Sequence, residues 1–181
     1  MRNFVLVMVM AACLGMVLPL QAAPPSRDTV LPLLAGRHGP PDPAALLALG
    51  PEVATTLMEL AADPSLTNIF RFRALYMLRH FDTEAVGQFL EGRLAAESGA
   101  VHVRRALRVL GDLQGRSQPQ RVQSQAEALL NHGDVHVRLE AARWLGRVGD
   151  AAARQRLRQH MRSVSGWERA QMLGVTSEDV P

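Results

Sequence analysis

The sequence predicts an all-α, right-handed solenoid of about four helix-pair repeats, and three observations support this fold class. Related segments recur with a period in the low thirties, since Arg71, Arg104 and Arg138 hold the same place in three of them. A period of this size is typical of two-helix units that stack on one another. Aromatic residues make up 4% of the chain, which favours helices over strands. Hydrophobic residues make up 48%, which excludes a wholly disordered chain.

The first segment, residues 1–22, has the layout of a secretory signal peptide. Arg2 provides the positive start, an apolar stretch runs from Phe4 to Leu20, and Ala22 offers a small residue for cleavage after Ala22 or Ala23. An uncleaved anchor is the alternative, although the stretch is at the short limit for spanning a bilayer. We therefore expect a periplasmic or secreted protein, or else one anchored to the membrane by this segment.

Cys13, the one cysteine of the chain, follows Met10-Ala11-Ala12, which resembles the lipobox of bacterial lipoproteins. The apolar stretch before it is short and continues after it, and both features argue against lipidation. If the signal is removed, the mature chain has no cysteine, which excludes thiol chemistry. Contact with a membrane is expected only if the N-terminus is uncleaved or Cys13 is lipidated.

Residues 23–41 are rich in proline and are expected to form an extended, poorly ordered tether. The repeat domain then covers residues 42–175, and residues 176–181 form a C-terminal tail. The helices are expected at 42–49, 51–62, 66–81, 83–97, 100–113, 119–131, 134–148, 150–162 and 165–174. Asp134 and Asp150 stand where an N-cap belongs, and each follows a glycine that can end the preceding helix. Pro51 and Pro119 suit the first turns of their helices.

The helix expected at 134–148 has two apolar stripes. One contains Val137, Ala141, Trp144, Leu145 and Val148, and the other, nearly opposite, contains Val135, Leu139 and Ala142. A polar sector between them holds His136, Glu140, Arg143 and Arg147. A surface helix has one apolar stripe, so this helix is expected to be packed on two sides inside a helical array.

The residues Gly133-Asp134-Val135-His136-Val137-Arg138, followed by Ala141-Ala142, Leu145-Gly146 and Gly149-Asp150, resemble a HEAT-like repeat of the type found in phycobiliprotein-lyase-related proteins. The resemblance covers residues 42–175 and implies a superhelix with a concave binding surface lined by the second helix of each pair. It implies a protein–protein interaction scaffold or adaptor. It also leaves open a chromophore-lyase-like enzyme as an alternative.

Two recurring residue types are expected to have structural roles. In HEAT-like families the arginine at positions 71, 104 and 138 commonly pairs with an aspartate of a neighbouring turn, and Asp63, Asp82, Asp112, Asp134 and Asp150 are available. His102 and His136 precede two of these arginines, but a zinc site needs three or four converging ligands. We expect no metal and no cofactor.

A basic stripe is the main candidate for function. Arg154, Arg158 and Arg162 lie at steps of four residues on one helix, and Arg143 and Arg147 belong to the same half of the chain. Residues 99–181 contain 13 arginines against 8 acidic residues, whereas residues 23–98 contain 6 against 9. We expect these five arginines to bind an acidic surface of another envelope protein, and a solvated helix face is the alternative.

Other classes of function are less favoured. The chain has no phosphate loop, nucleophile motif or paired-carboxylate signature, so no catalytic residue is assigned and an enzyme is not expected. Binding of nucleic acid or anionic lipid by the arginines stays an alternative; nucleic acid is not the expected partner.

Overall fold

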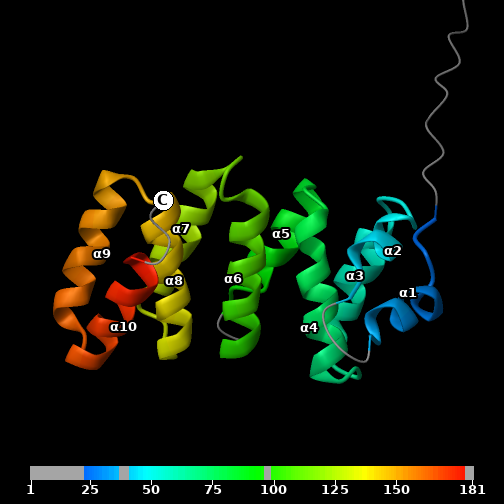
Figure 1. Ribbon diagram of the computed structural model, residues 1–181, viewed down its shortest axis with the longest axis horizontal. Coiled ribbons are helices and arrows are strands. Elements are labelled where there is room, and N and C mark those ends of the chain that lie inside the picture. The colour runs from blue at the N-terminus through cyan, green and yellow to red at the C-terminus, as the bar shows by residue number, and fades with distance from the viewer. Residues whose placement is uncertain (1–22, 37–40, 96–98, 178–181) are drawn as a thin grey trace, which may run out of the picture.

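The computed structural model describes residues 23–36, 41–95 and 99–177 of the chain. These residues form helices and contain no strand, so the prediction of an all-α solenoid is confirmed (Figure 1). In chain order the elements are α1 (Arg27–Leu34), α2 (Pro43–Leu47), α3 (Val53–Ala62), α4 (Asn68–Met77), the 3₁₀ turn η1 (Leu78–His80), α5 (Glu84–Gly92), α6 (Ala100–Gln114), α7 (Pro119–Leu129), α8 (Val135–Val148), α9 (Ala151–Ser163) and α10 (Gly166–Ser177).

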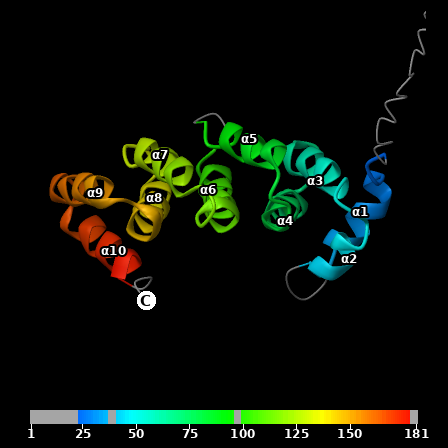
Figure 2. The ribbon, with the colours of Figure 1, turned by 90° about the horizontal axis from the view of Figure 1, so that it is seen from above.

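The helices form two rows along an arc. Figure 2 shows α3, α5, α7 and α9 in an outer row and α4, α6, α8 and α10 in an inner row, with both ends of the arc bent toward the inner row. The inner helices pack closely side by side, whereas the outer helices contact one another much less. This difference in spacing curves the solenoid, and it makes the inner row the concave side.

Local signals fix where several helices begin. The side chain of Asp134 accepts hydrogen bonds from the backbone N–H groups of His136 and Val137 at 2.9 and 3.2 Å, and that of Asp150 accepts one from Ala153 at 2.7 Å. Both aspartates are therefore the predicted N-caps. Pro119 is the first residue of α7, where its missing N–H costs no helical hydrogen bond.

The core runs continuously between the two rows. On α8 both predicted apolar stripes contribute to it: Val137, Ala141, Ala142 and Leu145 are fully buried. The small residues of α8 bring its neighbours close, as predicted. A Cβ on Gly146 would lie 3.2 Å from the methyl group of Thr176 on α10.

The first helix, α1, was not predicted from the sequence. Residues 23–41 were expected to form an extended tether, but Arg27–Leu34 form α1, and the prediction is wrong for these residues. Ser26 caps the helix by accepting a hydrogen bond from the N–H of Thr29 at 3.3 Å. Val30 and Leu34, one turn apart, are fully buried against the rest of the solenoid. Their burial outweighs the helix-breaking effect of the prolines nearby.

Polar contacts hold α1 in place. Arg73 on α4 donates a hydrogen bond to the carbonyl oxygen of Leu34 at 2.7 Å, and the hydroxyl of Thr56 on α3 donates one to the carbonyl of Pro25 at 2.6 Å. Arg27 forms an ion pair with Asp63, which follows α3. All these partners lie more than thirty residues away in the sequence. The segment is therefore ordered by tertiary contacts that its own composition does not reveal.

These contacts predict a loss of stability in acid. Hydrogen bonds from Ser65 and Arg27 lower the pKa of Asp63 from 3.8 to about 2. The carboxylate therefore stabilises the folded state fully above its unfolded pKa, and this contribution disappears as the pH falls from 3.8 to about 2. Thermal unfolding at stepwise lower pH should show a steeper fall in this range for the wild type than for Asp63→Asn. Parallel curves for the two proteins would contradict this account.

The predicted signal peptide and Cys13 lie outside the described residues. At the other end, α10 extends to Ser177, past the predicted start of the tail at residue 176.

Candidate functional site

The inner helices α4, α6 and α8 each present one exposed stripe to the concave side. Their other faces are covered by neighbouring inner helices and by the outer row. On α6 the exposed residues are Val101, Arg105, Arg108 and Asp112, which recur at helical spacing. Ile69 and Tyr76 hold the same place on α4, and His136 and Arg147 on α8. The concave surface is therefore built mainly from arginine and large apolar side chains.

An arginine cluster, Arg104, Arg105 and Arg108, lies at the centre of this surface on α6. The guanidinium of Arg105 lies 4.2 Å from the ring centroid of Phe72 on α4. That of Arg79 lies 4.1 Å from the ring of Tyr76. Such cation–π contacts hold a guanidinium in place without neutralising its charge.

Only one arginine of this cluster, Arg108, has a carboxylate partner among the described residues. Arg108 donates two hydrogen bonds to the buried carboxylate of Glu140 on α8, with Nε 3.1 Å from Oε1, and this pairing raises the pKa of Arg108. Arg104 and Arg105 have no carboxylate partner among the described residues. Burial lowers the pKa of Arg105, and the positive charges of Arg104 and Arg108 lower it further. A negative ligand group would relieve this repulsion.

His102, next to this cluster, lies among the same positive charges. Its ring packs on Phe72 with the centroids 4.9 Å apart. Burial lowers the pKa of His102, and Arg71, Arg93 and Arg105 lower it further. Positive charge therefore accumulates between α4 and α6 from both helices and from the end of α5.

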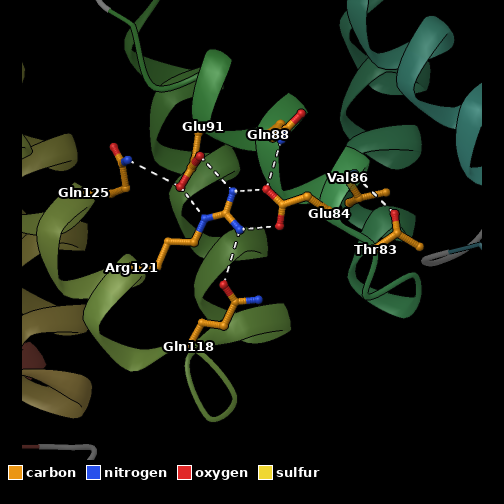
Figure 3. Close-up of polar contacts among 8 residues, drawn as sticks. All are labelled: Thr83, Glu84, Val86, Gln88, Glu91, Gln118, Arg121 and Gln125. Atoms are coloured by element: carbon orange, nitrogen blue, oxygen red, sulfur yellow. Dashed lines mark hydrogen bonds and ion pairs between the residues drawn. The ribbon is translucent and has the colours of Figure 1, made fainter.

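The outer row shows the opposite arrangement. Arg121 on α7 reaches across to α5, where it donates to Glu91 at 2.6 and 2.9 Å and to Glu84 at 2.9 and 3.2 Å (Figure 3). Hydrogen bonds from Arg121 lower the pKa of both glutamates, and the same hydrogen bonds raise the pKa of Arg121. Gln118 also accepts from Arg121, and Gln88 and Gln125 donate to the two carboxylates. This arginine is neutralised within the protein and is a structural link between α5 and α7.

Shallow hollows follow the concave surface from α4 to α8. One of about 180 Å³ between α4 and α6 is lined by Phe72, Tyr76, Arg104, Arg105, Arg108 and Val109. One of about 150 Å³ between α6 and α8 includes His136 and Arg143. A larger one, of about 460 Å³, lies at the far end of α6 and α8 and includes Trp144 and Arg147. These hollows suit side chains of a bound macromolecule better than a deeply enclosed small molecule.

The predicted binding residues are divided between two faces. Arg143 and Arg147 lie on α8 and border hollows of the concave surface. Arg154, Arg158 and Arg162 are exposed on α9 in the outer row, so the expectation that the second helices line the concave side is wrong. The arginine cluster of α6 and the aromatic residues Phe72 and Tyr76 were missed. The helical spacing of the exposed positions on α6 is visible in the sequence. It indicates a binding surface only once α6 is known to lie in the inner, concave row.

The predicted arginine–aspartate ladder also takes a different form. Of the three recurring arginines only Arg138 binds a carboxylate among the described residues, and this is Glu168 rather than an aspartate, at 2.6 and 2.8 Å. Arg71 donates to Asn68 instead. Other ion pairs join neighbours within a row: Arg79–Asp112, Arg108–Glu140 and Arg138–Glu168 in the inner row, Arg121–Glu91 and Arg156–Glu127 in the outer row.

The described residues hold no group of three or more histidine, cysteine, aspartate or glutamate side chains placed to bind a metal. The Nδ1 atom of His132 accepts a hydrogen bond from the N–H of Asp134 at 3.0 Å, which gives this side chain a structural partner. Within the same residues, no helix combines the length and hydropathy needed to cross a bilayer.

Comparison with known proteins links part of the chain to a family. The family model of HEAT repeats matches residues 100–174, from the start of α6 into α10. The comparisons with curated proteins and with solved structures gave no match. The matched region contains the arginine cluster and all of α8.

Proposed function

Because this chain is a HEAT-like repeat protein, we propose that it is an exported scaffold that binds an acidic partner protein on its concave surface. HEAT repeats commonly serve as protein-interaction scaffolds, and stacked helix pairs provide extended concave surfaces without an enclosed catalytic cleft. The partner in this proposal is another protein of the cell envelope, in keeping with the predicted signal peptide. No catalytic role is proposed for any residue.

The single observation that carries the proposal is the charge on the concave surface. Arg104 and Arg105 have no carboxylate partner among the described residues, while Arg121 on the outer row is fully engaged. Unneutralised arginines beside aromatic rings are typical of interface residues, because they combine charge with apolar contact. Charge complementarity raises the association rate and weakens with salt.

The α9 stripe, Arg154, Arg158 and Arg162, is the competing surface. Its three side chains are exposed and form no ion pair in the part of the chain that the structure describes. Exposed charges at this spacing on a single helix are commonly solvated. The concave surface is favoured because there the arginines from successive helices surround hollows and aromatic side chains.

Cross-linked capture from the envelope fraction of the source cell tests the proposal. Wild type is compared with Arg105→Glu/Arg147→Glu on the concave surface and with Arg154→Glu/Arg158→Glu on α9, which changes the net charge equally. We expect wild type and the α9 variant to recover the same acidic protein, and the concave variant to lose most of it.

Three results would contradict this proposal in different ways. Loss of the partner by the α9 variant alone would move the interface to the outer row. Recovery of nucleic acid or anionic lipid instead of a protein would favour the alternative partners. Recovery of no partner together with turnover of a small molecule would favour a lyase-like enzyme.

A further inference from the structure

Two junctions between inner helices contain the same kind of contact, a buried glutamate paired with an arginine. At the α6–α8 junction, Glu140 of the later helix is 4% exposed and accepts two hydrogen bonds from Arg108 of the earlier helix. At the α8–α10 junction, Glu168 is 6% exposed and accepts two from Arg138. Each later helix therefore brings a buried carboxylate to an arginine of the helix before it.

The α4–α6 junction has a different contact: Arg79 of η1 pairs with Asp112 of α6, whose side chain is 28% exposed, and no buried glutamate of the described residues lies there. Glu140 stands five residues before Leu145-Gly146, and Glu168 stands five residues before Leu173-Gly174. The corresponding Leu-Gly of α6 is Leu110-Gly111, and the residue five positions before it is Arg105. The charge at this register position is thus reversed, and the junction carries a positive group where its neighbours carry a negative one.

The surroundings of Arg105 are suited to a ligand. Its guanidinium is held over the Phe72 ring, beside the hollow of about 180 Å³ that Arg104 and Arg108 also line. A second hollow of about 230 Å³ adjoins it and is largely apolar, with Pro41, Ile69 and Tyr76 among its lining residues. Ile69 is 53% exposed, which is high for an aliphatic side chain of this size.

We propose that the α4–α6 junction binds a carboxylate of the partner protein, because Arg104 and Arg105 line its hollow and have no carboxylate partner among the described residues. The ligand is an extended acidic segment in which an aspartate or glutamate lies next to an apolar residue. The carboxylate contacts Arg105 and Arg104, and the apolar side chain lies beside Ile69 and Tyr76. This inference rests on the proposed function and specifies the chemistry of its site.

Geometry favours a peptide over a membrane at this position. The junction lies on the floor of the arc, between α4 and α6, with both ends of the solenoid bent past it (Figure 2). A planar bilayer would meet the ends of the arc first, whereas an extended chain can follow the floor. A guanidinium also binds a carboxylate in a planar, two-bonded geometry that a narrow interhelical site can select.

A binding assay with short peptides tests the inference. The probes are two fluorescent peptides that have three glutamates on each side of either a leucine or a serine. Measured by fluorescence anisotropy, Arg105→Glu should lower the affinity for the leucine peptide by about tenfold or more. Arg158→Glu on α9, with the same change in charge, should lower this affinity by less than about twofold. The leucine peptide should bind wild type more tightly than the serine peptide. Unchanged thermal unfolding of Arg105→Glu would show that the effect is not a loss of folding.

The outcomes separate this inference from the proposed function. Equal weakening by the two variants, or no difference between the peptides, would overturn the specific site. Capture of the same acidic partner by an Arg105→Glu single variant as by wild type would also overturn it, yet would leave the scaffold function intact. Peptide binding that depends on Arg105, without any partner in the envelope fraction, would support the site and contradict the function. Stronger binding of anionic vesicles than of either peptide would overturn the proposed occupant.

Discussion

Replacing Leu34 with alanine is expected to lower the free energy of unfolding by about 2–4 kcal/mol. Leu34 is fully buried at the end of α1, where it packs against the solenoid together with Val30. The substitution removes apolar contact and leaves a cavity that the adjacent α3 and α4 fill only in part. The hydrogen bond from Arg73 to the Leu34 carbonyl would remain, because it involves only the backbone of this residue.

Urea unfolding followed by circular dichroism measures this effect, and Leu47→Ala is the matched control. Leu47, on the next helix, is 45% exposed, so its truncation should cost less than about 1 kcal/mol. Hydrogen exchange should also show faster exchange of the α1 amides in the Leu34 variant, since α1 is an end element that can open locally. Equal, small effects of the two substitutions would indicate that residues 27–34 behave as a tether after all.

Gly111→Ala is expected to lower the free energy of unfolding by about 1–3 kcal/mol, because the added methyl group overpacks the core. A Cβ at this position would lie 2.1 to 2.5 Å from three ring atoms of Trp144, far inside van der Waals contact. The indole is 5% exposed and connects α8 to α6, so it cannot move aside without opening this contact. The glycine is therefore required by the close approach of the two inner helices.

Gly92→Ala provides the control for this prediction. Gly92 is the last residue of α5, whereas Gly111 lies three residues before the end of α6, and a Cβ on Gly92 would meet no atom within 4 Å. Alanine at Gly92 should be neutral or stabilise the helix by up to about 1 kcal/mol. Thermal unfolding monitored by far-UV circular dichroism compares the two variants. A Gly111 variant as stable as wild type would show that Trp144 can repack.

Several local features of the helices were predicted from the sequence. The two apolar stripes of α8 were predicted from helical spacing alone. Of the predicted polar sector of His136, Glu140, Arg143 and Arg147, His136 and Arg147 are exposed, whereas Glu140 is buried and pairs with Arg108 of α6. The N-caps Asp134 and Asp150 were predicted from their neighbours in the chain. These features depend on contacts within a few residues, which local sequence specifies directly.

The five arginines that were predicted to bind a partner do not lie on one face. Arg143 and Arg147 were identified, but they were grouped with Arg154, Arg158 and Arg162, which the fold places on the other row. The arginine cluster on α6 gives no local signal that separates it from other exposed arginines. Its distinction is that Arg104 and Arg105 have no carboxylate partner among the described residues, which depends on how α4 and α6 pack.

The sequence by itself therefore determined the helical class, the repeat and the two apolar stripes of α8, because helical periodicity and capping act over a single turn. Only the tertiary structure decided that Arg27–Leu34 join the core, which row is concave, and which acid each arginine binds. These outcomes join residues about thirty positions apart. They follow from the curvature of the stack, which brings corresponding positions of successive helices together, and no short stretch of sequence encodes that curvature.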